Sequence, residues 1–162
     1  MNKIQELITT LSKTLPKFKD GRIDYSNSVR APVINVFIKY KENILLLKRS
    51  DKVNSYQDKW NCVGGYLDDF QPLKDKVLEE IHEELNIQEN IIKNIIFGEI
   101  HEFHDPDINK TWIIQPILVE LKENPKIKLD WEHTDYKWIN PNNIETYDIV
   151  PKLAKSLSLV LK

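Results

Sequence analysis

The chain has 162 residues, about the length of one domain, and its 23 basic and 25 acidic residues nearly balance. This balance argues against nucleic-acid binding driven by a basic surface. A single cysteine, Cys62, excludes an intramolecular disulfide framework and a multi-cysteine zinc site. No apolar run approaches the length of a membrane span, and the N-terminus lacks the pattern of a signal peptide. We therefore expect a cytoplasmic protein that binds neither nucleic acid nor membrane.

Apolar residues at helical spacing predict a short amphipathic helix over residues 2–14, which Pro16 would end. We interpret residues 1–16 as a helical extension of one domain that spans residues 1–162. Residues 29–40 are rich in β-branched and aromatic side chains, and the turn K-E-N joins them to a second such run, which predicts a β-hairpin.

The polar loop 51–59 leads into the sequence WNCVGGYL, which predicts a short strand that ends at the pair Gly64-Gly65. After Pro72, apolar positions predict a helix from residue 73 to about Asn86. Three further strands are expected from the sequences IIKNIIFGEIHEF, TWIIQPILVEL and DYKWIN, and two short helices from the prolines at 141 and 151. Few helices among many strands predict an α/β (α+β) fold, with a mixed β-sheet between helices.

The predicted helix carries the stretch VLEEIHEEL, with four glutamates in six positions. At about 100° per residue, Glu80, Glu83 and Glu84 share one face of the helix. Like charges three or four residues apart destabilise a helix by a few tenths of a kcal/mol per pair, and only Lys76 lies four residues from a glutamate of this face. One interpretation is a solvated acidic face. The other is a ligand set for magnesium or manganese, which prefer carboxylate oxygens.

Together with the residues before it, this helix resembles the signature of the Nudix hydrolase family. That signature is a glycine, five residues, a glutamate, seven residues, and then R-E-U-x-E-E-x-G-U, where U is aliphatic. The spacing fits without a gap, and the matching residues are Gly65, Glu80, Ile81, Glu83, Glu84 and Ile87. Three positions depart from the pattern: Gln71 stands at the first glutamate, Glu79 at the arginine and Asn86 at the second glycine.

The resemblance implies a Nudix-type α/β/α sandwich and a metal-dependent pyrophosphohydrolase that cleaves a nucleoside diphosphate linked to another moiety. It further implies that Mg²⁺ or Mn²⁺ is held by the Gly64 carbonyl and by Glu80, Glu83 and Glu84, which are also the implied catalytic residues. The implied partner is a small-molecule nucleotide, and the chain would be a monomer or a homodimer.

Three residues outside the signature are further candidates. Arg49 would end a strand that leads to the site, and a guanidinium suits a substrate phosphate. Glu132 and Glu102 are candidates for an extra general base or metal ligand.

Two other functions remain open at this point. A non-catalytic Nudix-fold nucleotide-binding module is favoured by Glu79, which reverses the charge of the family arginine. An isopentenyl-diphosphate isomerase shares this fold but has a reactive cysteine followed by serine and histidine, whereas Cys62 is followed by Val63 and Gly64.

Overall fold

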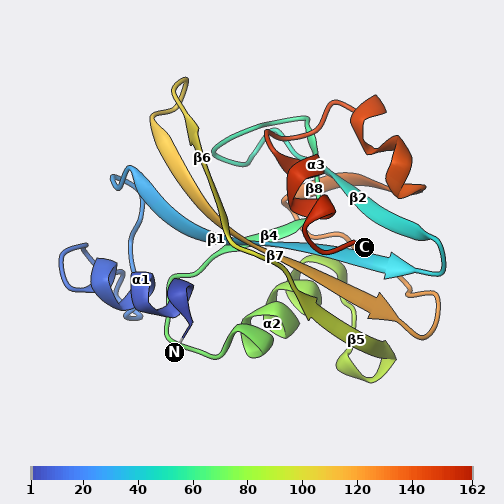
Figure 1. The fold of residues 1–162 in the computed structure, drawn as a ribbon, viewed down its shortest axis with the longest axis horizontal. Coiled ribbons are helices and arrows are strands. Elements are labelled where there is room, and N and C mark those ends of the chain that lie inside the picture. Colours follow the sequence, from blue (N-terminus) through green and yellow to red (C-terminus); the bar gives the residue numbers. More distant parts are fainter. Residues whose placement is uncertain (1, 162) are drawn as a thin grey trace.

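The computed structural model describes residues 2–161, which form an eight-stranded mixed sheet with helices on both faces (Figure 1). At the centre, β1 (Arg30–Tyr40) pairs in parallel with β7 (Lys110–Leu121), and the other strand pairs are antiparallel. The remaining strands are β2 (Asn43–Arg49), β3 (Trp60–Asn61), β4 (Val63–Tyr66), β5 (Ile92–Phe97), β6 (His101–Asp105) and β8 (His133–Ile139). The predicted mixed sheet is confirmed.

Helices cover the two faces of this sheet and give it two hydrophobic cores. In Figure 1, α2 (Leu73–Leu85) lies below the sheet and α3 (Leu153–Ser158) lies above it. Successive side chains of β1 alternate between the cores, because Val36 packs with the apolar face of α2, whereas Phe37 packs with that of α3. The other helical segments are α1 (Lys3–Ser12), which joins the α2 core, and the 3₁₀ turns η1 (Glu89–Ile91) and η2 (Pro141–Thr146). The α/β/α sandwich is therefore confirmed.

Two predicted strands were wrong in their extent. The sequence WNCVGGYL does not form one strand that ends at the glycines, because β3 pairs with β2 whereas β4 pairs with β1 and continues through both glycines to Tyr66. The predicted strand over residues 91–103 is also two, since β5 and β6 are separated at residues 98–100 and pair with different parts of β7. In both cases the chain changes its pairing partner within a stretch that is rich in strand-forming residues, and periodicity alone does not record such a change.

Helix α2 is placed by its two ends. Pro72 precedes its first turn, and Asn86 ends it in the left-handed conformation with a φ of 59°, a role that asparagine shares with glycine. Between these ends, Val77, Ile81 and Leu85 are fully buried and fix the rotation of the helix. This rotation turns Glu80 toward Gly65 of β4 and Glu84 toward His133 at the start of β8, and it leaves Glu79 and Glu83 exposed.

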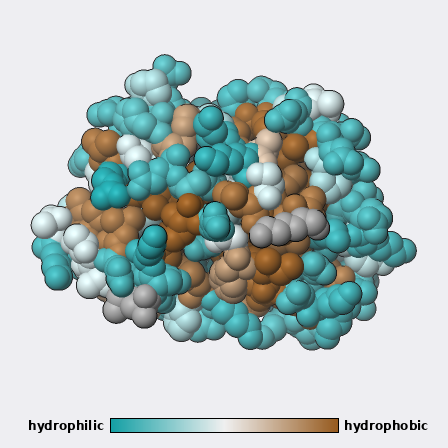
Figure 2. Space-filling model, in the orientation of Figure 1, coloured by the Kyte–Doolittle hydropathy of each residue, from teal (hydrophilic) through white to brown (hydrophobic). Residues whose placement is uncertain are grey.

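Hydrophilic and hydrophobic residues are unevenly distributed over one face of the protein (Figure 2). Hydrophilic residues surround the margin of the face shown in Figure 2, and hydrophobic residues gather across its middle. Within residues 2–161, no helix is long and apolar enough to cross a membrane.

Candidate active site

A cavity of about 200 Å³ opens between the central strands and the C-terminal end of α2. Its walls come from β1, β2, the 51–59 loop, β4, α2, β7 and the segment before β8. Four of the residues predicted for the site line it, namely Arg49, Gly64, Glu84 and Glu132. The fold thus brings together groups that are far apart in the sequence.

Glu84 is the most buried acid of the cavity, with only 3% of its side chain exposed. Its Oε1 lies 3.6 Å from His133 Nε2, and its Oε2 is buried with no hydrogen-bond partner. Burial raises the pKa of Glu84 well above its usual value, and the negative charges of Glu132 and Glu80 raise it further. A buried carboxylate with an unpaired oxygen is stabilised by binding either a proton or a cation.

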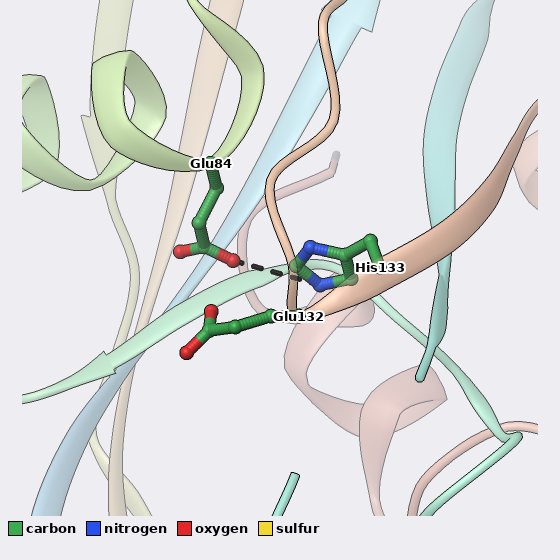
Figure 3. Close-up of side chains that lie close together, drawn as sticks. All are labelled: Glu84, Glu132 and His133. Atoms are coloured by element: carbon green, nitrogen blue, oxygen red, sulfur yellow. Dashed lines mark ion pairs between the residues drawn. The ribbon is translucent and has the colours of Figure 1, made fainter. Parts of the chain in front are cut away.

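Glu84, Glu132 and His133 form a cluster whose ligand atoms all lie within 4.8 Å of one another (Figure 3). Figure 3 shows the Glu84 side chain descending from α2 toward Glu132 and His133. His133 Nδ1 lies 3.2 Å from Asp130 Oδ1, an arrangement that fixes the imidazole ring, and burial lowers the pKa of His133. Two carboxylates beside an oriented imidazole are a suitable ligand set for a divalent cation.

Glu80 lies on the same side of α2, one turn before Glu84, and packs directly against Gly65. A Cβ atom at residue 65 would lie 2.6 Å from Glu80 Oε1 and 2.7 Å from its Cδ, so this close approach requires glycine. Burial raises the pKa of Glu80 to about 7, although the nearby Lys76 lowers it. The glycine at the start of the signature therefore makes room for the glutamate within it.

We expect Gly65→Ala to lower turnover by about tenfold to a hundredfold, because the Glu80 carboxylate must move by a sizeable fraction of an ångström or more. The clash is with the end of a flexible side chain, so the fold should be retained. The measurement is steady-state turnover, together with thermal unfolding to confirm that the variant is folded. A folded variant with wild-type turnover would show that the position of Glu80 is not critical.

The remaining predicted residues are less closely associated with the cavity. Glu83 is exposed, so the three glutamates of the predicted ligand face differ widely in burial. Glu102 is also exposed, is not among the residues that line the cavity, and lies 3.4 Å from Arg30 in a surface ion pair. Of the two candidates for an extra base, the structure therefore brings Glu132 to the cavity and leaves Glu102 outside it.

Arg49 is held in a fixed orientation at the cavity wall. Its Nε and Nη2 groups donate hydrogen bonds of 3.0 and 2.9 Å to the carbonyl oxygen of Ser55. Burial lowers the pKa of Arg49, while the charges of Glu132 and Glu84 raise it. The other N–H groups of the guanidinium remain available to an anionic ligand.

An aromatic wall made of Tyr56, Tyr66 and Trp112 lines the cavity, and its two tyrosines were not predicted. The Trp112 ring lies 6.1 Å from that of Tyr66 and 6.5 Å from that of Tyr56. The indole Nε1 donates to Tyr56 Oη at 3.0 Å, and Tyr56 Oη in turn donates to Asp105 Oδ2 at 2.7 Å, so the rings are held in place. These residues come from a loop and two strands, and no local spacing in the sequence links them.

His133 was also missed as a residue of the site. It opens β8, and Glu132 lies in the turn just before this strand. Neighbouring residues within a strand point to opposite faces. This rule does not apply to Glu132 and His133, because Glu132 precedes the strand. The only available signal was that His133 follows Glu132 directly, and adjacency alone does not predict a shared site.

The chain is similar to known proteins in both sequence and fold. The family model described as the NUDIX domain matches residues 29–160. The nucleoside triphosphatase NudI of Escherichia fergusonii is 25% identical over 120 residues, a match that covers 71% of this chain and 85% of that protein.

Solved structures show the same fold. The MutT protein from Methanosarcina mazei superposes with a TM-score of 0.66 at 20% identity, over 82% of this chain and 93% of the other. An Ap4A hydrolase from C. elegans, solved as a binary complex, gives a TM-score of 0.63 at 17% identity, over 79% and 93%. From the family match, the fold and the grouping of the signature residues, we conclude that the chain belongs to the Nudix hydrolase family, whose enzymes act on phosphoanhydride bonds.

Proposed function

We propose that this chain is a pyrophosphohydrolase that depends on Mg²⁺ or Mn²⁺ and cleaves a nucleoside diphosphate linked to another moiety. The observation that carries the proposal is the buried Glu84 carboxylate, which has one oxygen without a partner and opens on a cavity that also contains Arg49. A purely structural acid at this depth would be paired on both oxygens.

The residues of the site fit a divalent cation. Glu80 and Glu84 both have raised pKa values because burial disfavours their charged forms, and a cation would offset this cost. Glu84, Glu132 and His133 are grouped closely enough to share one ion, and Glu80, the exposed Glu83 and the Gly64 carbonyl would complete the ligand set. When bound, the ion supplies neutralisation of the pyrophosphate and a lowered pKa for the attacking water.

The chain's own groups provide the rest of the reaction. Glu132 is half-buried, and burial raises its pKa, so its carboxylate is suited to accept the proton of a water molecule that attacks one phosphorus. The bond between that phosphorus and the bridging oxygen breaks, and this oxygen leaves with the second phosphate. Arg49 would hold a phosphate oxygen through its free N–H groups.

The aromatic wall supports a nucleotide as the substrate. Tyr66 and Trp112 present ring faces on which a base can stack, whereas the acids and Arg49 would face the phosphates. The names of two similar proteins, a nucleoside triphosphatase and an Ap4A hydrolase, fit this class. The candidates are nucleoside triphosphates, ADP-sugars, dinucleoside polyphosphates and dinucleotide cofactors.

A screen of these four classes with and without Mg²⁺ or Mn²⁺ tests the proposal. We expect the release of a nucleoside monophosphate from at least one class, and no release when the metal is removed with a chelator. Calorimetric titration with the same nucleotides is run in parallel. Binding without turnover in every class would overturn the proposal and favour a non-catalytic nucleotide-binding module.

A further inference from the structure

We propose that Lys76 is a positioning residue that holds the Glu80 carboxylate in place, and that the segment before the family domain supports it through Arg22 and Asp68. This inference rests on the proposed function in taking Glu80 as a residue of the reactive site. It adds a role for a lysine that lies outside the matching positions of the signature, and for a segment that lies outside residues 29–160.

Lys76 is a buried ammonium group surrounded by carboxylates. Only 7% of its side chain is exposed, and its Nζ lies 3.3 Å from Glu80 Oε1, 3.4 Å from Asp68 Oδ1 and 3.4 Å from Glu79 Oε2. Three carboxylates surround the ammonium group at ion-pair distance, so its buried positive charge is compensated by its acidic neighbours.

The oxygen that Lys76 contacts is the one that Gly65 also contacts. Glu80 Oε1 lies 2.6 Å from the position that a Cβ atom at residue 65 would take and 3.3 Å from Lys76 Nζ, so it is held between the backbone of β4 and the ammonium group. Without the lysine, the Glu80 carboxylate would face the like charge of Glu83 uncompensated. Lys76 thus opposes a displacement that glycine alone would permit.

The N-terminal segment holds the second partner of this lysine. Arg22 Nη1 lies 3.5 Å from Asp68 Oδ2, and the Ile23 N–H donates to the Asp68 carbonyl at 2.7 Å. Tyr25 Oη donates to the Leu67 carbonyl, also at 2.7 Å. A chain of contacts therefore runs from Arg22 through Asp68 and Lys76 to Glu80.

Glu79 lies close enough to Lys76 for a cation at residue 79 to be tested as its replacement. Its Oε2 accepts a hydrogen bond of 2.9 Å from Gln71 Nε2 and lies 3.4 Å from Lys76 Nζ. A cationic side chain at residue 79 can therefore reach the space that the ammonium group occupies. If Lys76 acts through its charge on Glu80, an arginine at residue 79 should replace it.

The test compares Lys76→Gln, Lys76→Arg and the double variant Lys76→Gln/Glu79→Arg, with Lys74→Gln as the matched control. Lys74 lies on the same helix, is exposed and pairs only with Glu89 among the described residues, at 3.6 Å. We expect Lys76→Gln to lower kcat about tenfold to a hundredfold with KM within about twofold, because a misplaced group acts on the reactive step. Lys76→Arg and the double variant should recover most of kcat, and Lys74→Gln should match the wild type.

Titration calorimetry with Mn²⁺ gives a readout that does not depend on turnover. Lys76→Gln should bind Mn²⁺ about tenfold more weakly than the wild type, and the double variant should restore the affinity. Wild-type kcat and Mn²⁺ affinity in folded Lys76→Gln would overturn this inference and leave the proposed function standing. A folded double variant that recovers neither quantity would also overturn it, because charge at this point would then not be the requirement.

If Lys76→Gln does not fold, Asp68→Asn and Arg22→Gln take its place. Each removes one contact of the same chain, and we expect kcat to fall about threefold to tenfold in Asp68→Asn and less in Arg22→Gln. Wild-type kcat in both variants would overturn the supporting role of the N-terminal segment. Absence of turnover in the wild type would instead contradict the proposed function, and the Mn²⁺ titrations would still decide the role of Lys76.

Discussion

Glu84→Gln should abolish turnover of the best substrate from the screen and at the same time stabilise the folded protein. Glu84 is proposed as a ligand of the cation that activates the attacking water, so its loss should lower kcat by about 10²-fold or more. Stability should rise because glutamine carries no charge into a site where only 3% of the side chain is exposed. Its amide can also donate to Glu80 or Glu132, the acids that raise the pKa of Glu84. A gain of about 1 to 2 kcal/mol corresponds to a rise in Tm of roughly 2–8 °C for a chain of this size.

Glu83→Gln is the matched control for this variant. Glu83 is exposed and lies beside Glu84 on the same helix, so its replacement should lower turnover without a comparable gain in stability. Thermal unfolding of both variants without metal measures the gain in stability, and their turnover with Mg²⁺ measures the loss of activity. A loss of stability in Glu84→Gln would mean that the wild-type carboxylate is already compensated within the protein.

The stability of the metal-free protein should fall as the pH rises from 6.5 to 8. Burial raises the pKa of Glu80 to about 7 and that of Glu84 well above its usual value, whereas both return to about 4.5 in the unfolded chain. In this window the folded chain therefore binds more protons than the unfolded chain, so stability decreases with pH. If the folded chain binds one more proton than the unfolded chain across these 1.5 pH units, the free energy of unfolding falls by about 2 kcal/mol, which lowers Tm by roughly 4–8 °C.

The lower limit of this window is set by two histidines. Burial lowers the pKa values of His101 and His133 below 6.5, so they produce the opposite slope at lower pH. Mg²⁺ or Mn²⁺ should reverse the fall above pH 6.5, because a cation binds the deprotonated acids. The measurement is Tm against pH with a chelator and with metal, and Glu84→Gln should show a weaker slope. A metal-free Tm that rises from pH 6.5 to 8 would contradict this prediction.

The sequence was most informative where the site is built from local spacing. The apolar positions after Pro72 predicted a helix that ends at about Asn86, and α2 does so. The resemblance to the family signature pointed to Glu84 and Gly64 as residues of the site, and both line the cavity. Local spacing is informative here because one helix and the strand before it determine the relative positions of their own residues.

The parts that could not be predicted depend on segments distant in sequence. A helical projection places Glu80, Glu83 and Glu84 on one face but does not show that the segment before β8 buries Glu84 and leaves Glu83 exposed. Glu132 and Glu102 were equivalent candidates, and only the pairing of β8 with β2 brings one of them to the cavity. The two tyrosines of the aromatic wall were missed for the same reason.

The parallel pairing of β1 with β7 has a consequence for how this chain is made. Arg30 pairs with Thr111 and Lys39 with Glu120, so paired residues of the two central strands are separated in sequence by about half of the chain. Contacts between residues so far apart form slowly, because a long loop must close before they contribute. During synthesis, β1 leaves the ribosome long before β7 exists, and the edge of β1 that pairs with β7 stays open until then. Chaperone dependence and aggregation of C-terminally truncated chains are therefore expected to begin at this strand.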